Sequence, residues 1–491
     1  MENGAHIYVD LEKALDNNAE LGRLDIVKCL VKKGADIDAS NALQLSARNG
    51  HLDIVKYFVD NGVDINACHG EALIGSAKEG HLEVVKFLVK RGANIRARDD
   101  FALRMSASNG HLDIVKFLVK KKSANSRVQL GTESGAKNGH VDVVKYLVEK
   151  GADIHANNEY ALRSSAGNGH LVMVKYLIEK GANIHADNEY ALRLSADGGH
   201  LDVVKALVEK GADIHAYDNL TFRMSAQNGH LDVVEFLVEK GADINADNEY
   251  ALRWSAHNGH LAIVKYLVEK GADIHANFEY ALQWSAECGH FDVVKFLVEK
   301  GANIHANFEY ALRLSAQNGH VNVVKFLVEK GADIHAKSED ALGWSAQNGH
   351  LGVVKFLVEK GADIHAKNEC ALQWSARNGH LDVVKYLVEK SADIFSDQAF
   401  LLSTDYRHLG VVEHLGVVEY LVKEGESFLP FQRSVSKKYL DVAKYLVKKG
   451  ANNFNSFHDK QNIVKYKMLL IQMNDVIYTI DAYICEWLWK P

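Results

Sequence analysis

A Gly-His pair recurs along most of this chain at nearly constant spacing, and this repetition constrains the fold more than any other feature. Successive histidines lie 30 residues apart, except for one step of 29 between His111 and His140. A fixed period of roughly 20 to 50 residues is typical of proteins in which each repeat packs only on its neighbours. The chain of 491 residues is therefore predicted to be one repeat array. The histidines of these pairs are His51, His81, His111, His140, His170, His200, His230, His260, His290, His320, His350 and His380.

Each repeat is predicted to contain two short helices, as the unit NEYALRWSAHNGHLAIVKYLVEKGADIHA at residues 248–276 shows. The first helix is expected at about residues 249–257, before Gly259 provides the left-handed conformation of a turn. The second is expected at about residues 261–270, before a loop. Apolar and small residues at helical spacing should bury one face of each. They are Ala251, Leu252, Ser255 and Ala256 in the first helix, and Leu261, Val264, Leu267 and Val268, widened by Ile263 and Tyr266, in the second.

Neither predicted helix reaches the dozen or so residues that an isolated helix needs for marginal stability. The apolar stripes must therefore be covered by the repeats before and after, which gives one continuous core. The second-helix pattern can be counted about fifteen times. The predicted fold is an all-α solenoid of about fifteen stacked helix-turn-helix repeats of about 30 residues.

The repeat resembles the ankyrin repeat in its first helix, its Gly-His turn, its second helix and its Gly-Ala-Asp-Ile ending. The closeness of the copies and the 30-residue period resemble the ankyrin proteins of giant DNA viruses that infect amoebae (mimivirus-like). Two departures stand out, because the ankyrin unit is about 33 residues long and opens with Thr-Pro-Leu-His. Here the opening reads Tyr-Ala-Leu-Arg, as at residues 250–253, and the loop is shorter. The resemblance implies a concave face lined by first helices and a shortened projecting finger.

The array is predicted to fill most of the chain. Residues 1–8 form a lead-in, residues 9–451 hold the repeats, and residues 452–491 form a helical cap or a docking tail. Two joints are irregular, near residues 122–132 and 391–416, where a helix-ending glycine is replaced and HLGVVE occurs twice in succession. We expect a bend or lower local stability at both.

Composition restricts the function and the location. The formal net charge of −7 argues against a surface for nucleic acid, which needs clustered Lys and Arg. The five cysteines form no CxxC pair, so a reducing intracellular compartment is expected, and in a viral protein the host cytoplasm. No secretory signal or membrane-spanning run is visible. A monomer without cofactors is expected.

Candidate chemical groups are better explained by structure. Stacked repeats place the Gly-His histidines about 10 Å apart, too far to share a metal ion, so each should hydrogen-bond to nearby backbone. The histidines that end the loops, such as His155, His185 and His275, are expected in solvent. Glu-Arg pairs four residues apart predict a surface salt-bridge ladder instead of acid-base catalysis. They are Glu159 and Arg163, Glu189 and Arg193, Glu249 and Arg253, and Glu309 and Arg313.

The positions that differ between copies indicate where a partner could be recognised. One first-helix position varies from repeat to repeat and carries tryptophan four times, and tryptophan is enriched at binding hot spots. A second variable position precedes the turn. An alternative is that these tryptophans only fill space between helices, and that the polar positions drift freely. The candidate partner-binding residues are Trp254, Trp284, Trp344, Trp374, Met224, His257 and Glu287.

The sequence favours a non-catalytic scaffold that binds host or viral proteins through the first-helix face and the short loops. An alternative is a substrate adaptor for a ubiquitin ligase, which residues 452–491 would recruit. A third class, an enzyme, would need a catalytic domain for which the chain has no room outside the repeats. No catalytic residue, cofactor or metal site is predicted.

Overall fold

The chain is all-α, as predicted, in the part that the computed structural model describes. That part comprises residues 2–38, 41–121, 125–390 and 392, and it contains 26 helices and no strand. The helices belong to two compact units, residues 1–251 and 252–491, and the boundary falls inside α17. Each unit is described by itself below.

The first unit consists of paired helices, one pair for each repeat. The first helices of its pairs are α1 (Glu2–Glu20), α3 (Ala42–Arg48), α5 (Ala67–Lys78), α7 (Ala97–Ser108), α9 (Asn125–Lys137), α11 (Ala156–Gly167), α13 (Ala186–Asp197) and α15 (Ala216–Gln227). The second helices are α2 (Leu24–Lys32), α4 (Leu52–Asp60), α6 (Leu82–Lys90), α8 (Leu112–Lys121), α10 (Val141–Glu149), α12 (Leu171–Glu179), α14 (Leu201–Glu209) and α16 (Leu231–Glu239).

The second unit continues the same pattern from α17 (Ala246–His257), which begins in the first unit. Its other first helices are α19 (Ala276–Glu287), α21 (Ala306–Gln317), α23 (Ala336–Gln347) and α25 (Ala366–Arg377). Its second helices are α18 (Leu261–Glu269), α20 (Phe291–Glu299), α22 (Val321–Glu329), α24 (Leu351–Glu359) and α26 (Leu381–Glu389).

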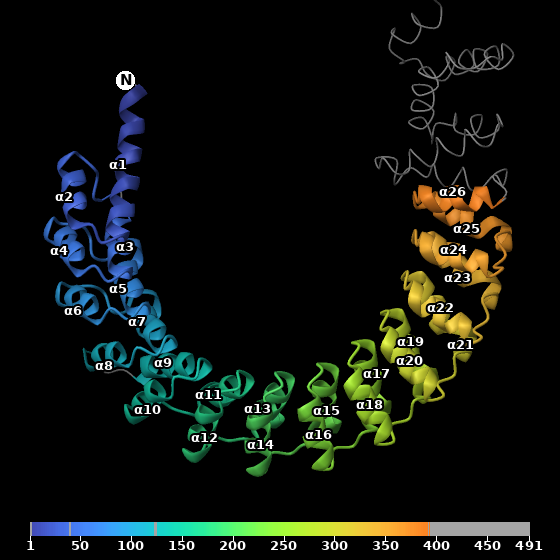
Figure 1. The fold of residues 1–491 in the computed structure, drawn as a ribbon. Helices are drawn as coiled ribbons and strands as arrows, with labels where there is room; N and C mark the ends of the chain where they lie inside the picture. The colour runs from blue at the N-terminus through green and yellow to red at the C-terminus, as the bar shows by residue number, and fades with distance from the viewer. Residues whose placement is uncertain (1, 39–40, 122–124, 391, 393–491) are drawn as a thin grey trace, which may run out of the picture. The chain divides into compact units, whose positions relative to one another are not determined.

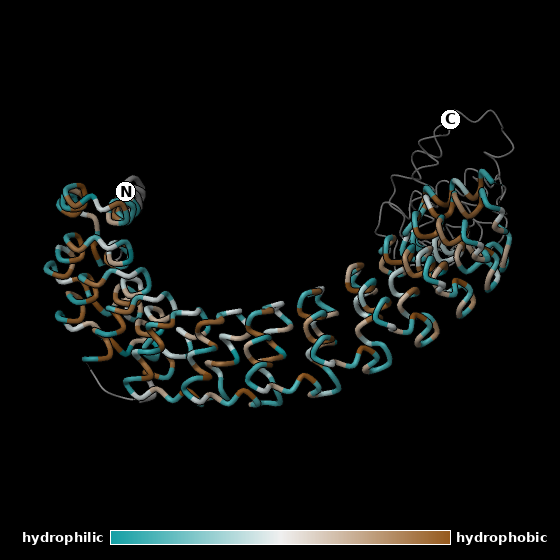
Figure 2. Tube along the Cα trace, turned by 60° about the horizontal axis from the view of Figure 1, so that its bottom comes forward, coloured by the Kyte–Doolittle hydropathy of each residue, from teal (hydrophilic) through white to brown (hydrophobic). Residues whose placement is uncertain are grey.

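Within each unit the helices stack in the order of the sequence, which confirms a helical repeat solenoid (Figure 1). First helices pack on the first helices of neighbouring repeats, as α19 does on α21, and also on the second helix of their own repeat. Hydrophobic residues are concentrated in the helices, and the turns between them are mostly hydrophilic (Figure 2). The core is therefore a continuous layer between the two helix rows of each unit.

Burial in the second helices differs slightly from the prediction. In α18, Ile263, Val264 and Leu267 are almost fully buried, whereas Leu261 and Val268 are only partly buried. Ile263 was expected only to widen the stripe, but it belongs to the core. The reason is that the helix is covered by its own first helix and by two neighbouring repeats, so the buried face is broader than one stripe. In the first helix, all four residues that were predicted to be buried are buried.

The Gly-His turn has the structural role that its spacing predicted. Gly259 has φ +77°, a left-handed conformation that glycine adopts without steric cost. The imidazole Nε2 of His290, one repeat later, donates to the carbonyl of His257 at 2.9 Å. The same bond joins His111 to Lys78 at 2.8 Å. Each such histidine thus satisfies a carbonyl at the end of the preceding repeat's first helix and joins the two repeats.

The sequence did not predict how the chain enters the first helix. α17 begins at Ala246, and its next three residues, Asp247 to Glu249, all have φ between +53° and +60°. A left-handed turn therefore precedes the right-handed helix. The same three-residue turn occurs in α5, α7, α11, α13, α15, α19, α21, α23 and α25. Left-handed residues other than glycine cost about 1–2 kcal/mol each, so other contacts must hold this turn in place.

Those contacts correct the predicted salt-bridge ladder. Glu159 ends a left-handed turn, is buried, and does not pair with Arg163. Its Oε1 accepts a hydrogen bond from Nδ1 of His155 at 2.6 Å. Arg163 instead donates to the carbonyl of Asn157 within the turn at 2.9 Å, and to Asp187 of the next repeat. Glutamate and arginine therefore hold the two ends of the turn instead of pairing with each other.

The same arrangement recurs at Glu189 and Glu309, which accept hydrogen bonds from His185 and His305 at 2.5 and 2.7 Å. The loop-ending histidines are thus not simply solvated, although their rings remain about half exposed: 55% for His155 and 58% for His305. One nitrogen of each ring holds the buried glutamate, and this bond closes the loop onto the helix.

This pairing predicts a pH dependence of stability. The hydrogen bond from the paired glutamate raises the pKa of His155, His275 and His335, and nearby aspartates act in the same direction. A raised pKa in the folded state contributes stability that is complete below the ordinary histidine pKa of about 6.5 and is lost as pH rises through the raised pKa. We expect the difference in free energy of unfolding between wild type and H155N/H275N/H335N to shrink over that range, as measured by urea unfolding.

The variant is matched to this chain, because Asn245 occupies the same position in the repeat of Glu249. Other groups also make the free energy of unfolding depend on pH, such as His350, whose pKa is lowered by burial. The difference between wild type and variant cancels these contributions, because both proteins contain the same groups. Parallel stability curves for the two proteins between pH 5.5 and about 8.5 would contradict the prediction.

Several predicted features lie wholly or partly outside the described residues. The predicted irregular joint near residues 122–132 is described from Asn125 onward, within α9. Residues 393–491 contain nearly all of the joint at 391–416, the last two repeats and the predicted tail, so these stay predictions. Among the helices that the structure does describe, none combines the length and apolar character that crossing a bilayer requires.

Candidate functional site

Two neighbouring first helices, α17 and α19, bring together several of the predicted site residues. The rings of Trp254 and Trp284 meet edge to face with centroids 5.4 Å apart. His257 contacts both, at 5.1 Å from Trp254 and 5.7 Å from Trp284. Tyr280 stacks on Trp284 at 5.2 Å. We call Trp254, His257, Tyr280 and Trp284 the aromatic cluster. All four residues lie in the second unit, and all are partly exposed.

The sequence repeat explains why the cluster forms. Trp254 and Trp284 occupy equivalent positions 30 residues apart, and stacked helices approach to about 8–10 Å, within reach of two indole rings. The guanidinium of Arg253 lies 5.6 Å from the Trp284 ring centroid. Ring pairs at such distances stabilise one another by about 0.5–1.5 kcal/mol beyond burial, which favours this arrangement of the rings.

The chemistry of the cluster does not favour catalysis. Cys288 Sγ lies 3.4 Å from Nδ1 of His257, a spacing that could suggest an activated thiol. Burial and then the charge of Glu287 raise the pKa of Cys288, which keeps the thiol protonated at neutral pH. Across the described part of the chain, no group of three or more His, Cys, Asp or Glu residues could hold a metal ion.

The other two tryptophans lie farther along the second unit. The Arg313 guanidinium lies 5.1 Å from the ring centroid of Trp344. Trp374 borders a small hollow between α23 and α25, where Gly343 leaves room that arginine or glutamine fills in most repeats. At the equivalent position between Trp284 and Trp344 stands Leu314, which is buried. The four tryptophans therefore form no continuous aromatic strip, because Leu314 separates Trp254 and Trp284 from the other two.

The remaining predicted site residues have separate positions. Met224 lies on α15 of the first unit and is partly buried. Glu287 ends α19, and its carbonyl accepts hydrogen bonds from His320 and Asn318 of the next repeat. Its side chain is partly exposed, at the end of the helix that also carries Tyr280 and Trp284.

Sequence reasoning missed two side chains that the structure makes prominent. Phe278 and Phe308 are 78% and 62% exposed, which makes them the most exposed aromatic side chains in the described part of the second unit. They lie at equivalent positions in the left-handed turns of α19 and α21. A signal was present, because the same position holds Asn158, Asn188, Asp218, Asn248, Ser338 and Asn368 in other repeats. A phenylalanine among polar residues breaks the repeat pattern without filling the core.

Comparison with known families agrees with the architecture. A family model for ankyrin repeats (three copies) matches the chain in seven overlapping stretches, at residues 15–99, 68–130, 98–158, 134–218, 222–308, 274–338 and 312–398. Comparison with curated proteins gives no match. The family matches cover well over half of the chain and coincide with the helix pairs of both units. The chain therefore belongs to the ankyrin-repeat family.

Proposed function

We propose that this protein is a non-catalytic scaffold that binds other proteins through the first-helix face of its second unit. Ankyrin repeats generally mediate protein-protein interactions, and proteins of this kind are typically scaffolds. The observation that carries the proposal is the aromatic cluster, in which Trp254, His257 and Trp284 contact one another while staying partly exposed.

The cluster has the properties of a binding hot spot. Tryptophan is enriched at such spots because its large ring buries much apolar area and loses little conformational freedom. The edge-to-face contact of Trp254 with Trp284 fixes both rings in advance, which lowers the entropy cost of binding. We include Trp344, Trp374 and Glu287 as outer members of the proposed surface, and we keep Met224, on α15 of the first unit, as a separate candidate position.

The proposal predicts that W254L/W284L loses its bound proteins and keeps its fold. Leucine is a fitting replacement, because Leu45, Leu194 and Leu314 occupy the same position in other repeats. Loss of two aromatic anchors should weaken binding at least about tenfold each. Full-length wild type and variant would be used for affinity capture from cells, with quantitative mass spectrometry of the bound proteins.

W344L/W374L provides the matched control, since it makes the same change in two later repeats. We expect it to reduce capture less than W254L/W284L does, because Trp344 and Trp374 are separated from the cluster by Leu314. Circular dichroism and thermal unfolding check the fold of each variant. Equal recovery of the same proteins by wild type and W254L/W284L would rule out the cluster as the binding surface.

We further propose that the partners are intracellular proteins of an infected host cell, on the basis of the resemblance to viral ankyrin proteins. The alternative function, an adaptor for a ubiquitin ligase, depends on residues 452–491, which lie outside the described residues. Deletion of that segment should leave capture through the aromatic cluster intact and should remove ligase subunits if the adaptor function holds.

A further inference from the structure

Phe278 and Phe308 adopt a costly conformation and nevertheless stay mostly exposed. Their φ angles are +59° and +58°, in a region that bulky side chains avoid. Asparagine and aspartate tolerate this region, and they fill the position in most other repeats. Two exposed phenylalanines in adjacent repeats therefore have no explanation in the folding of this chain alone, and exposed apolar groups of this kind mark interaction sites.

The charge beside this pair is reversed relative to other repeats. Arg163 and Arg223 each pair with an aspartate 24 residues later, Asp187 and Asp247. The residue 24 positions after Arg313 is Lys337. Its ammonium lies 3.9 Å from the centroid of the Phe308 ring, and no carboxylate of the described chain lies within ion-pair distance of it. An exposed cation on an exposed aromatic ring is thus left for a partner to contact.

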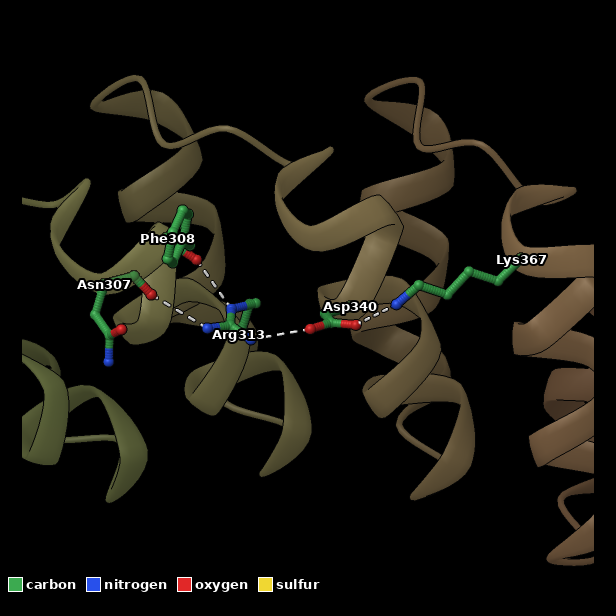
Figure 3. Close-up of polar contacts among 5 residues, drawn as sticks. All are labelled: Asn307, Phe308, Arg313, Asp340 and Lys367. Carbon is green, nitrogen blue, oxygen red and sulfur yellow. Dashed lines mark hydrogen bonds and ion pairs between the residues drawn. The ribbon is translucent and has the colours of Figure 1, made fainter.

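Arg313, which has Lys337 where other repeats have an aspartate, pairs with a different carboxylate. Arg313 donates to Asp340 at 2.9 Å, and Asp340 also accepts from Lys367 at 2.7 Å (Figure 3). Asp340 stands where Tyr160, Tyr190, Tyr250, Tyr280 and Tyr310 stand in other repeats. Because Asp340 neutralises Arg313, Lys337 can carry a net positive charge at this edge without disrupting the stack.

We propose that Phe278, Phe308 and Lys337, here called the phenylalanine edge, dock a short acidic segment of a protein partner. This inference rests on the proposed protein-binding function and adds a second surface to it. Neighbouring stacked helices lie about 8–10 Å apart, so the backbone positions of the two phenylalanines are separated by about one such step. Two apolar side chains seven residues apart lie on one face of a helix and have about this spacing. A carboxylate next to the second apolar residue would meet Lys337.

A membrane surface is the less favoured occupant. The exposed carboxylates of Asp273 and Asp333 lie in the loops before Phe278 and Lys337, Asp363 lies in the next loop, and all three would be repelled by anionic lipid. A protein segment can place its single carboxylate at Lys337 and avoid these three. The short length of the edge also suits a peptide better than a flat bilayer.

The test is selection from a displayed library of random 12-residue peptides against the full-length chain. We expect enrichment of peptides with two apolar residues seven positions apart and an acidic residue beside one of them. Synthetic copies of the enriched peptide would then be titrated by fluorescence anisotropy. F278N/F308N should bind it at least tenfold more weakly, because both apolar anchors are lost.

Charge reversal provides the reciprocal test. K337D should weaken binding of the acidic peptide and strengthen binding of the same peptide carrying lysine in place of its acidic residue. F278N/F308N should melt no lower than wild type, because asparagine suits the left-handed turn, so lost binding cannot be ascribed to unfolding. W254L/W284L should bind the peptide normally, which separates this surface from the aromatic cluster.

Four results would overturn the proposal: no enriched motif, a basic motif, equal affinity of wild type and F278N/F308N, or binding to phosphatidylserine vesicles that depends on the two phenylalanines. Loss of captured cellular proteins in W254L/W284L, without any effect of F278N/F308N on either readout, would leave the scaffold function standing and remove the phenylalanine edge alone.

Discussion

Replacing Gly80 with alanine is expected to destabilise the first unit by about 3 kcal/mol, the largest effect of any single methyl group that we predict. Gly80 has φ +89°, and a β-carbon there would lie 2.6 Å from Cε1 and 2.8 Å from Nδ1 of His111. The ring cannot swing away freely, because its Nε2 donates to the carbonyl of Lys78 at 2.8 Å. The substitution therefore combines backbone strain with loss of the bond that joins two repeats.

Gly92, twelve residues later, provides the matched control. Its φ of +101° is equally unsuited to alanine, but a β-carbon there would meet no atom within 4 Å. G92A should thus lose only the backbone contribution, about 1–2 kcal/mol. Urea unfolding followed by circular dichroism measures both, and hydrogen exchange shows whether the loss is centred on α5 to α8 in G80A. If G92A proves as destabilising as G80A, the histidine contact has no energetic role.

Removing the carboxylate of Asp340 should cost the second unit about 2–3 kcal/mol. The side chain of Arg313 is only 8% exposed and that of Asp340 13%, so this ion pair is largely shielded from water. In D340A, the guanidinium keeps its hydrogen bonds to the carbonyls of Phe308 and Asn307 but loses its counter-ion (Figure 3). An uncompensated charge in such a position is strongly destabilising, whereas an exposed one is not.

Two further variants separate the contributions. K367M removes the other partner of Asp340, but this lysine side chain is 42% exposed, so the loss should stay below about 0.5 kcal/mol. K337D/D340Y restores the pattern of the repeats in which Arg163 pairs with Asp187 and stacks on Tyr190. It should recover most of the stability lost in D340A, as judged by denaturant unfolding at low salt. Equal stability of D340A and wild type would show that Arg313 is held by backbone carbonyls alone.

The helix ends show where sequence reasoning succeeds and where it fails. The second helix was expected at residues 261–270 and is α18, Leu261–Glu269. Its limits follow from local signals, the turn at Gly259 and the glycine at 271. The first helix was expected from residue 249, yet the chain enters it through a left-handed turn at Asp247 to Glu249. Asp, Asn and Glu are also ordinary residues for a helix start, so the sequence cannot separate the two conformations.

The candidate site was likewise predictable from the sequence only in part. Repeat spacing was sufficient to place Trp254 and Trp284 on neighbouring helices, and variation among the copies singled them out. The contact of both with His257, and the separation of Trp344 from them by buried Leu314, depend on side-chain packing. Phe278 and Phe308 were missed because exposure is a property of the stacked array. In a single repeat, a phenylalanine at that position could equally have been buried by its neighbours.

The sequence by itself determined the two-helix repeat, its period, the glycine turns and most residues of the core. Those features depend on helical periodicity and on the backbone freedom of single residues, both of which are local. Only the tertiary structure decided which partner each glutamate takes, because Glu159 lies four residues from both His155 and Arg163 and either spacing allows a bond. Stacking buries the carboxylate on the side of the histidine and leaves the arginine to the backbone and the next repeat. Burial depends on neighbouring repeats, so no single repeat contains that information.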